Sequence, residues 1–114
     1  MVLVIGGAFS GKRAYVQSLG YANADMADAA LDSRPVLYNL QDLVAQDPAG
    51  CMALVDALLQ KEVVVCNEVG SGVIPGERRE RLVREQTGRL CNRLAQSATR
   101  VVRVVCGVPV VIKG

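Results

Sequence analysis

Strands and helices alternate along this chain, as the spacing of its apolar residues indicates. Two uninterrupted apolar runs, Val2–Ile5 and Val63–Cys66, are rich in β-branched residues and are typical of strands covered on both faces. Lys12–Leu19 predicts a helix that ends at Gly20, because glycine readily takes the left-handed conformation that closes a helix. A brief run, Val36–Tyr38, predicts a further strand.

Helical spacing of apolar residues dominates the second half of the chain. Residues 49–60 predict one helix, and residues 77–97 predict the longest one. The apolar stripe of this longest helix consists of Leu82, Val83, Leu90, Cys91, Leu94 and Ala95. Residues 101–105 and 108–112 predict two final strands, joined either as a hairpin or as one kinked strand. Residues 21–35 have weak periodicity and suit either a short helix or an irregular link.

This order of elements predicts an α/β protein, because strands that alternate with helices form a parallel sheet covered on both sides. We expect three layers, a mostly parallel sheet and, since 114 residues suit one compact core, a single domain over residues 1–114. Apolar residues make up 51% of the chain, which argues against intrinsic disorder. No apolar run reaches the roughly eighteen residues of a membrane span, and the start of the chain does not fit a signal peptide, so we expect a cytoplasmic protein.

Charge and residue types exclude several classes of function. The net charge of +2 is too small for a strongly basic nucleic-acid binder, and the arginines of the longest predicted helix alternate with glutamates. The chain has no histidine, which excludes imidazole bases, nucleophiles and metal ligands. Its cysteines lie far apart in the sequence, so a zinc site is not expected. Cys66 and Cys106 sit in valine-rich runs and are predicted to be small buried hydrophobic residues.

A glycine-rich segment after the first predicted strand satisfies the GxxxxGK pattern of a phosphate-binding loop. We call this segment, residues 6–12, the phosphate loop; it consists of Gly6, Gly7, Ala8, Phe9, Ser10, Gly11 and Lys12. Glycines allow consecutive backbone N–H groups to point at phosphate oxygens, and the following helix adds partial positive charge. Lys12 reaches the outer phosphates as a point charge. The sequence therefore predicts nucleotide binding by these residues, whereas the alternative is a glycine-rich turn without a ligand.

The residue after the phosphate loop departs from this pattern. The motif normally ends in serine or threonine, whose hydroxyl helps to hold Mg²⁺, but this chain has Arg13 there. Arginine cannot ligate a cation, so Arg13 either adds positive charge next to the phosphates or points to solvent. Phosphate binding tolerates this substitution better than magnesium-dependent phosphoryl transfer does.

Polar residues at the ends of two other strands form a second candidate group. Asn67 and Glu68 come after the strand Val63–Cys66, and ligands of open α/β sheets sit beyond the carboxyl ends of the strands. Glu68 would bind Mg²⁺ through water or orient an attacking hydroxyl, and the alternative is a carboxylate that caps a local N–H group. Asp42 is a weaker candidate for the same role, because Asn39 stands where the shorter strand ends.

Together these residues resemble the bacterial adenosylcobinamide kinase/adenosylcobinamide-phosphate guanylyltransferase family. The first match is GGxxSGK in the phosphate loop, and the second and more specific one is NEVGxGxxP over residues 67–75. Gly88-Arg89 and the closing segment with Gly107, Pro109 and Lys113 also match, while the region of residues 21–61 is much shortened. The resemblance implies a P-loop NTPase-like fold and a homo-oligomer. It also implies a kinase that uses ATP or GTP and Mg²⁺ on the aminopropanol hydroxyl of adenosylcobinamide.

The resemblance also implies a second step, GMP transfer through a guanylylated histidine, which a chain without histidine cannot perform. Three interpretations of the function are therefore open. In the first, the chain is a reduced kinase with Lys12 on the phosphates, Glu68 at the metal or acceptor, and Arg13 or Arg89 adding charge. In the second it is a nucleotide-binding partner or regulator without catalytic activity. In the third it is a structural relic that binds no ligand.

Overall fold

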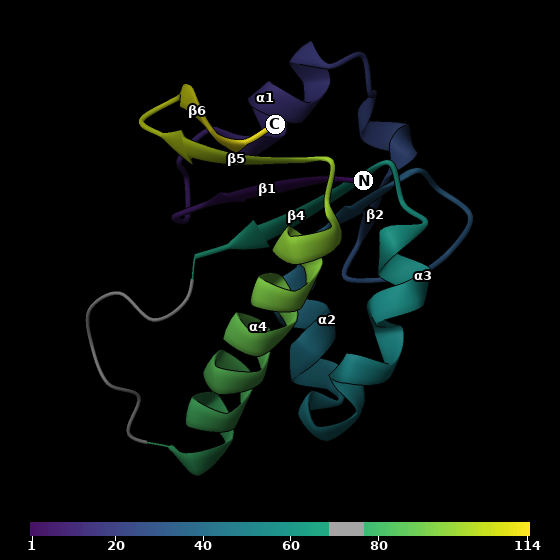
Figure 1. Cartoon of the computed structure of the whole chain (residues 1–114), viewed down its shortest axis with the longest axis vertical. Coiled ribbons are helices and arrows are strands. Elements are labelled where there is room, and N and C mark those ends of the chain that lie inside the picture. Colours follow the sequence, from purple (N-terminus) through teal and green to yellow (C-terminus); the bar gives the residue numbers. More distant parts are fainter. Residues whose placement is uncertain (69–76) are drawn as a thin grey trace.

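A twisted sheet forms the centre of the molecule in the computed structural model, which describes residues 1–68 and 77–114 (Figure 1). Within these residues the sheet has six strands in the order β2-β3-β4-β1-β5-β6. β6 is antiparallel to β5, and the other neighbouring strands are parallel. The strands are β1 Val2–Gly6, β2 Met26–Asp28, β3 Val36–Tyr38, β4 Val63–Asn67, β5 Arg100–Val105 and β6 Val108–Lys113.

Helices cover both faces of this sheet. Figure 1 shows α1 on one side and α2, α3 and α4 on the other. The α-helices are α1 Lys12–Ser18, α2 Leu40–Gln46, α3 Val55–Leu59 and α4 Arg78–Ser97, and the 3₁₀ helices are η1 Asn23–Asp25 and η2 Pro48–Leu54. This arrangement confirms the predicted α/β fold with three layers and a mostly parallel sheet. The single domain over residues 1–114 stays a prediction, because residues 69–76 lie outside the described part.

Two hydrophobic clusters, one on each face of the sheet, explain why the central strands β1 and β4 have no polar face. Val64 and Cys66 of β4 belong to the cluster beneath α2, α3 and α4, which also contains Leu90 of α4. Val63 and Val65 of the same strand belong to the cluster on the α1 side. Successive side chains of a strand point to opposite faces, so a strand covered on both sides must be apolar at every position.

The middle of the chain differs from the helix and link that its pattern predicted. Residues 21–35 contain η1 and the short strand β2, which is too brief to show a period. Residues 49–60 form no single helix, because η2 precedes α3. Pro48 begins η2, and the Asp47 side chain accepts a hydrogen bond from the Gly50 N–H at 3.3 Å, which tightens this turn. Two apolar residues at helical spacing, Met52 and Leu82, are exposed rather than buried.

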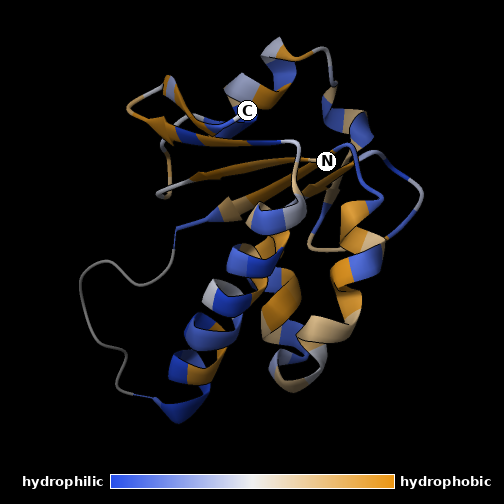
Figure 2. Cartoon of the chain, in the orientation of Figure 1, coloured by the Kyte–Doolittle hydropathy of each residue, from blue (hydrophilic) through white to orange (hydrophobic). Residues whose placement is uncertain are grey.

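The final strands form a hairpin rather than one kinked strand, and this places Cys106 in solvent. Cys106 and Gly107 make the turn, both with positive φ angles of 49° and 77°. Such angles are typical of the tight turns that match the twist of a hairpin. The prediction of a buried Cys106 is therefore wrong, whereas that of a buried Cys66 is confirmed. Figure 2 shows the hairpin largely in the colours of hydrophobic residues, although every residue of β6 is exposed.

Candidate functional site

The phosphate loop connects β1 to α1 at the carboxyl edge of the sheet. Gly6, its first residue, is paired with Asn67 in the parallel register of β1 and β4. The backbone N–H of Glu68 donates to the Gly6 carbonyl at 2.8 Å, so the residue after β4 lies directly beside the loop. A turn within the loop is closed by the Ser10 N–H, which donates to the Gly7 carbonyl at 3.2 Å. The loop therefore occupies the position predicted for it, between a buried strand and a helix.

The β5–β6 hairpin supports the phosphate loop from a distant part of the chain. The Gly107 N–H in the hairpin turn donates to the Ser10 carbonyl at 2.7 Å. Gly11 has a φ angle of 97°, and a Cβ atom there would lie 3.1 Å from the Cα of Gly107. Glycine is needed at this position because both the backbone angle and the close approach disfavour a side chain. The turn thus fixes the second half of the loop.

Lys12 places a positive charge inside the loop. Only 3% of the surface of Lys12 is exposed, and its Nζ donates a hydrogen bond to the Gly7 carbonyl at 2.6 Å. Burial lowers the pKa of the ammonium group, because removal from water disfavours the charged form. A phosphate that replaced this carbonyl as the acceptor would interact strongly with the ammonium group, because the group is partly removed from water.

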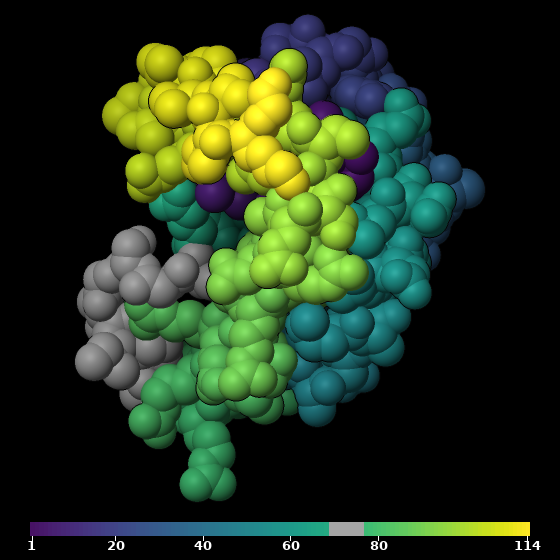
Figure 3. Space-filling model, in the orientation of Figure 1, coloured from purple at the N-terminus to yellow at the C-terminus, as the bar shows by residue number. Residues whose placement is uncertain are grey.

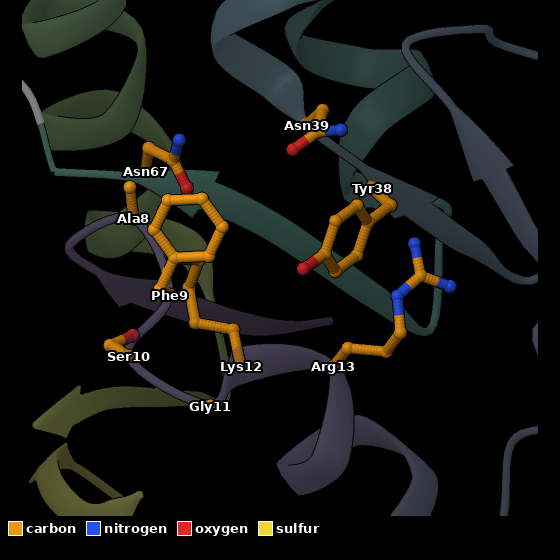
Figure 4. Close-up of a pocket in the computed structure, with 9 residues that line it drawn as sticks. All are labelled: Ala8, Phe9, Ser10, Gly11, Lys12, Arg13, Tyr38, Asn39 and Asn67. Carbon is orange, nitrogen blue, oxygen red and sulfur yellow. The ribbon is translucent and has the colours of Figure 1, made fainter. Parts of the chain in front are cut away.

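A cavity of about 440 Å³ opens beside the loop (Figure 4). It lies between the phosphate loop, the start of α1 and the ends of β3 and β4. The residues that line it are Ala8, Phe9, Ser10, Gly11, Lys12, Arg13, Tyr38, Asn39 and Asn67. Phe9 is fully exposed with a positive φ angle of 60°, and its ring stands at the edge of the cavity. The cavity brings together most of the predicted nucleotide-binding residues; Gly6 and Gly7 lie next to it.

Arg13 is exposed at one end of this cavity, and its guanidinium contacts neighbouring side chains in addition to solvent. Its guanidinium carbon lies 4.5 Å from the centroid of the Tyr38 ring, a distance typical of cation–π contacts. Its Nη1 donates to Asn23 Oδ1 at 3.1 Å and also approaches the Met26 sulfur at 3.7 Å. The side chain is thereby held between α1, η1 and the neighbouring strands β2 and β3.

Glu68 lies close to the loop but does not line this cavity. Its carboxylate accepts two hydrogen bonds from Arg103 of β5, one from Nε at 2.5 Å and one from Nη2 at 3.1 Å. Together with Arg103 it lines a neighbouring cavity of about 330 Å³ between the loop and β5. Asp42 is farther away, in a cavity of about 390 Å³ between α2 and α4. The structure therefore does not bring the predicted acidic residues together.

Asn39 directly follows β3, and its side-chain amide is held by hydrogen bonds to two other polar side chains. Asn39 precedes α2 in the left-handed conformation, with a φ angle of 60°. Its Nδ2 donates to Asp28 Oδ1 at 2.7 Å, and its Oδ1 accepts from Gln41 Nε2 at 3.1 Å.

The sequence did not predict Tyr38 and Arg103 as site residues. The position of Tyr38 at the end of a predicted strand was a usable signal, whereas nothing in the local pattern marked Arg103.

A model of one protein family matches residues 22–112, most of the chain; the family is described as cobinamide kinase/cobinamide phosphate guanyltransferase. The chain belongs to this family. The match covers the strand–Asn67–Glu68 segment and α4, which agrees with the resemblance seen in the sequence. It begins after α1, so the assignment of the phosphate loop rests on residues 6–12 themselves.

The chain is similar to the bifunctional adenosylcobalamin biosynthesis protein CobU of Salmonella typhimurium. It is 47% identical over 53 residues, which amount to 46% of this chain. The aligned stretch spans only 29% of the length of that protein.

In the part of the chain that the structure describes, no helix has both the length and the apolar character needed to cross a membrane.

The family motifs of the second half of the chain lie partly on described residues. Residues 69–75 of NEVGxGxxP lie outside the described ranges. Gly88, Cys91 and Asn92 of α4 line a small cavity of about 160 Å³ with Asn67 and Glu68. Arg89 points elsewhere, because its Nη2 pairs with Glu85 at 3.2 Å on the exposed face of the same helix. The arginine of this motif therefore does not reach the phosphate loop in this structure.

Proposed function

We propose that this chain binds ATP or GTP in the cavity beside the phosphate loop. One observation carries the proposal: Lys12, buried inside a glycine-rich loop after β1, borders a cavity large enough for the phosphates of a nucleotide. Backbone N–H groups of the loop and the ammonium of Lys12 supply the donors that phosphate oxygens need. Membership of the cobinamide kinase family supports the same conclusion and a role in cobalamin biosynthesis.

We further propose phosphoryl transfer to adenosylcobinamide as the first candidate for the reaction of the bound nucleotide. Lys12 would neutralise the outer phosphates, and Glu68 would hold Mg²⁺ or orient the acceptor hydroxyl. Glu68 lies beside the loop, but its carboxylate is paired with Arg103, so this role requires the ion pair to open. GMP transfer through a histidine is not part of the proposal, because the chain has none.

A nucleotide-binding partner or regulator without catalytic activity is the second candidate, and the engaged state of Glu68 favours it. The two candidates are separated by incubating the chain with adenosylcobinamide and γ-labelled ATP or GTP and measuring labelled adenosylcobinamide phosphate. Turnover that Lys12→Ala abolishes supports the kinase. Nucleotide binding by calorimetry without any turnover supports the partner. Failure to bind either nucleotide contradicts the proposed function.

We also propose that the chain associates with copies of itself through the β5–β6 hairpin. β6 ends the sheet, and exposed apolar residues gather on it: Val108, Val110, Val111 and Ile112. The hairpin forms one end of the molecular surface in Figure 3, where a second copy has access to it. An edge strand offers unpaired backbone groups together with these side chains.

Light scattering is expected to give a mass that is a multiple of 12.1 kDa for the unmodified chain. Ile112→Asp should shift the mass to that of one chain, because a buried unpaired charge opposes association. Leu19→Asp, which adds the same charge at an exposed position after α1, is the matched control and should leave the mass unchanged. A single-chain mass for the unmodified protein would contradict this proposal.

A further inference from the structure

We propose that Arg13 is a built-in cation of the nucleotide cavity, so that this chain binds nucleotide phosphates without a divalent metal ion. The inference rests on the proposed function, nucleotide binding beside the phosphate loop, and specifies the form of the ligand. Of the two roles proposed for Glu68, it keeps the orientation of the acceptor hydroxyl and replaces the binding of Mg²⁺. That form is the metal-free nucleotide, whose phosphates carry their full negative charge.

The residues of the cavity do not fit the Mg²⁺ that the fold family implies. Mg²⁺ in nucleotide sites is held by phosphate oxygens, water, a hydroxyl and one or two carboxylates. Here the hydroxyl is replaced by Arg13, β4 ends in Asn67, and Asn39 directly follows β3, so both positions carry amides. Among the described residues that line the cavity, none carries a carboxylate, whereas Lys12 and Arg13 are both cationic. A divalent cation would meet repulsion rather than ligands.

The acidic side chains near the loop are engaged elsewhere. Glu68 forms its ion pair with Arg103 in the neighbouring cavity. Asp28 accepts a hydrogen bond from Asn39 Nδ2 at 2.7 Å and does not line the nucleotide cavity. Recruiting either carboxylate to a metal would break these contacts, and the Glu68 contact is a charge-assisted, bidentate one.

Arg13 is positioned in advance for an anionic ligand. The face of Tyr38, the side-chain oxygen of Asn23 and the Met26 sulfur hold the guanidinium at the cavity edge. Asn23 is itself fixed, because its Oδ1 also accepts from Gln17 Nε2 at 2.9 Å. Guanidinium is charged at all physiological pH values and offers a planar set of donors that matches phosphate oxygens. Lys12 and Arg13 both line the cavity, and Figure 4 shows the Tyr38 ring between their side chains, so the two cations border the cavity at different places.

The test is calorimetric titration of the chain with ATP and GTP, once in EDTA and once with excess Mg²⁺. The unmodified protein should bind in EDTA at least as tightly as with Mg²⁺, because the metal competes for the oxygens that Arg13 contacts. Arg13→Ser, which restores a hydroxyl, should weaken binding in EDTA by roughly 10- to 150-fold, and added Mg²⁺ should recover part of the loss. Arg13→Lys keeps the charge without the planar donors and should fall in between.

Arg93→Ser is the matched control, because it removes the same charge from α4, where Arg93 contacts Ser97 on the exposed surface. Its affinity in EDTA should equal that of the unmodified chain. Circular dichroism melting checks that each variant is folded. Tighter binding of the unmodified chain with Mg²⁺, or equal affinity of Arg13→Ser in EDTA, would overturn this inference and leave nucleotide binding intact. Absence of binding in both conditions would overturn the proposed function itself.

Discussion

Replacing Lys12 by alanine is expected to weaken the binding of ATP or GTP by roughly 10- to 150-fold, since hydrogen bonds to charged groups contribute on the order of 1.5–3 kcal/mol. The ammonium of Lys12 is buried and already donates to the Gly7 carbonyl, so it exchanges one acceptor for another when phosphate enters. Titration calorimetry of the Lys12→Ala variant measures this change directly.

The chain offers a close control for this change in Lys61. The Nζ of Lys61 also donates to backbone carbonyls, those of Asp32 and of Arg34, the latter at 2.7 Å. Lys61→Ala therefore removes the same charge and the same kind of contact away from the cavity, and should leave the affinity unchanged. An equal loss of affinity in both variants would show that the net charge of the protein, and not the position of Lys12 in the loop, determines nucleotide binding.

The pH dependence of binding gives Lys12 a second signature. Burial lowers the pKa of its ammonium group, so the charge is lost at a lower pH than in an exposed lysine. Below the lowered pKa Lys12 is charged and binds phosphate, and affinity should decline as the pH rises through that pKa. The Lys12→Ala variant should lack this alkaline decline when titrated over the same pH range.

Replacing Gly6 by alanine is expected to lower the free energy of unfolding by about 1–3 kcal/mol, the usual effect of overpacking. It should also abolish nucleotide binding. A Cβ atom at Gly6 would lie 2.6 Å from the Val104 carbonyl oxygen and 2.5 Å from Ser10 Oγ. The carbonyl belongs to β5, which is held in the sheet by β1, so the loop must move instead. Urea unfolding measures the first effect and calorimetry the second.

Gly7 provides the comparison within the same loop. A Cβ atom there would meet nothing within 4 Å, and its φ angle is not positive. Gly7→Ala should therefore unfold at the same urea concentration as the unmodified chain. Equal stability of the Gly6→Ala and unmodified chains would show that the contact between the loop and β5 is looser than the structure has it.

Local pattern was sufficient to predict the elements that carry the candidate site. The apolar runs of β1 and β4 predicted strands covered on both faces, and the two hydrophobic clusters on opposite sides of the sheet confirm this. The order of glycines and lysine in residues 6–12 predicted a loop between strand and helix, which the structure has in that place. The same motifs, with Asn67 and Glu68, indicated the family. These features are local because they depend on residues adjacent in the chain.

Only the tertiary structure decided how the charged residues combine. Glu68 and Arg103 are 35 residues apart and meet because β4 and β5 both lie next to β1. Arg13 stacks on Tyr38 because α1 and β3 come together at the same edge of the sheet. The turn at Cys106 turned a predicted core residue into an exposed one. These contacts depend on strand order and turn geometry, which the spacing of apolar and polar residues along the chain does not reveal. The sequence therefore showed which charged residues are present, and the fold determined which of them pair.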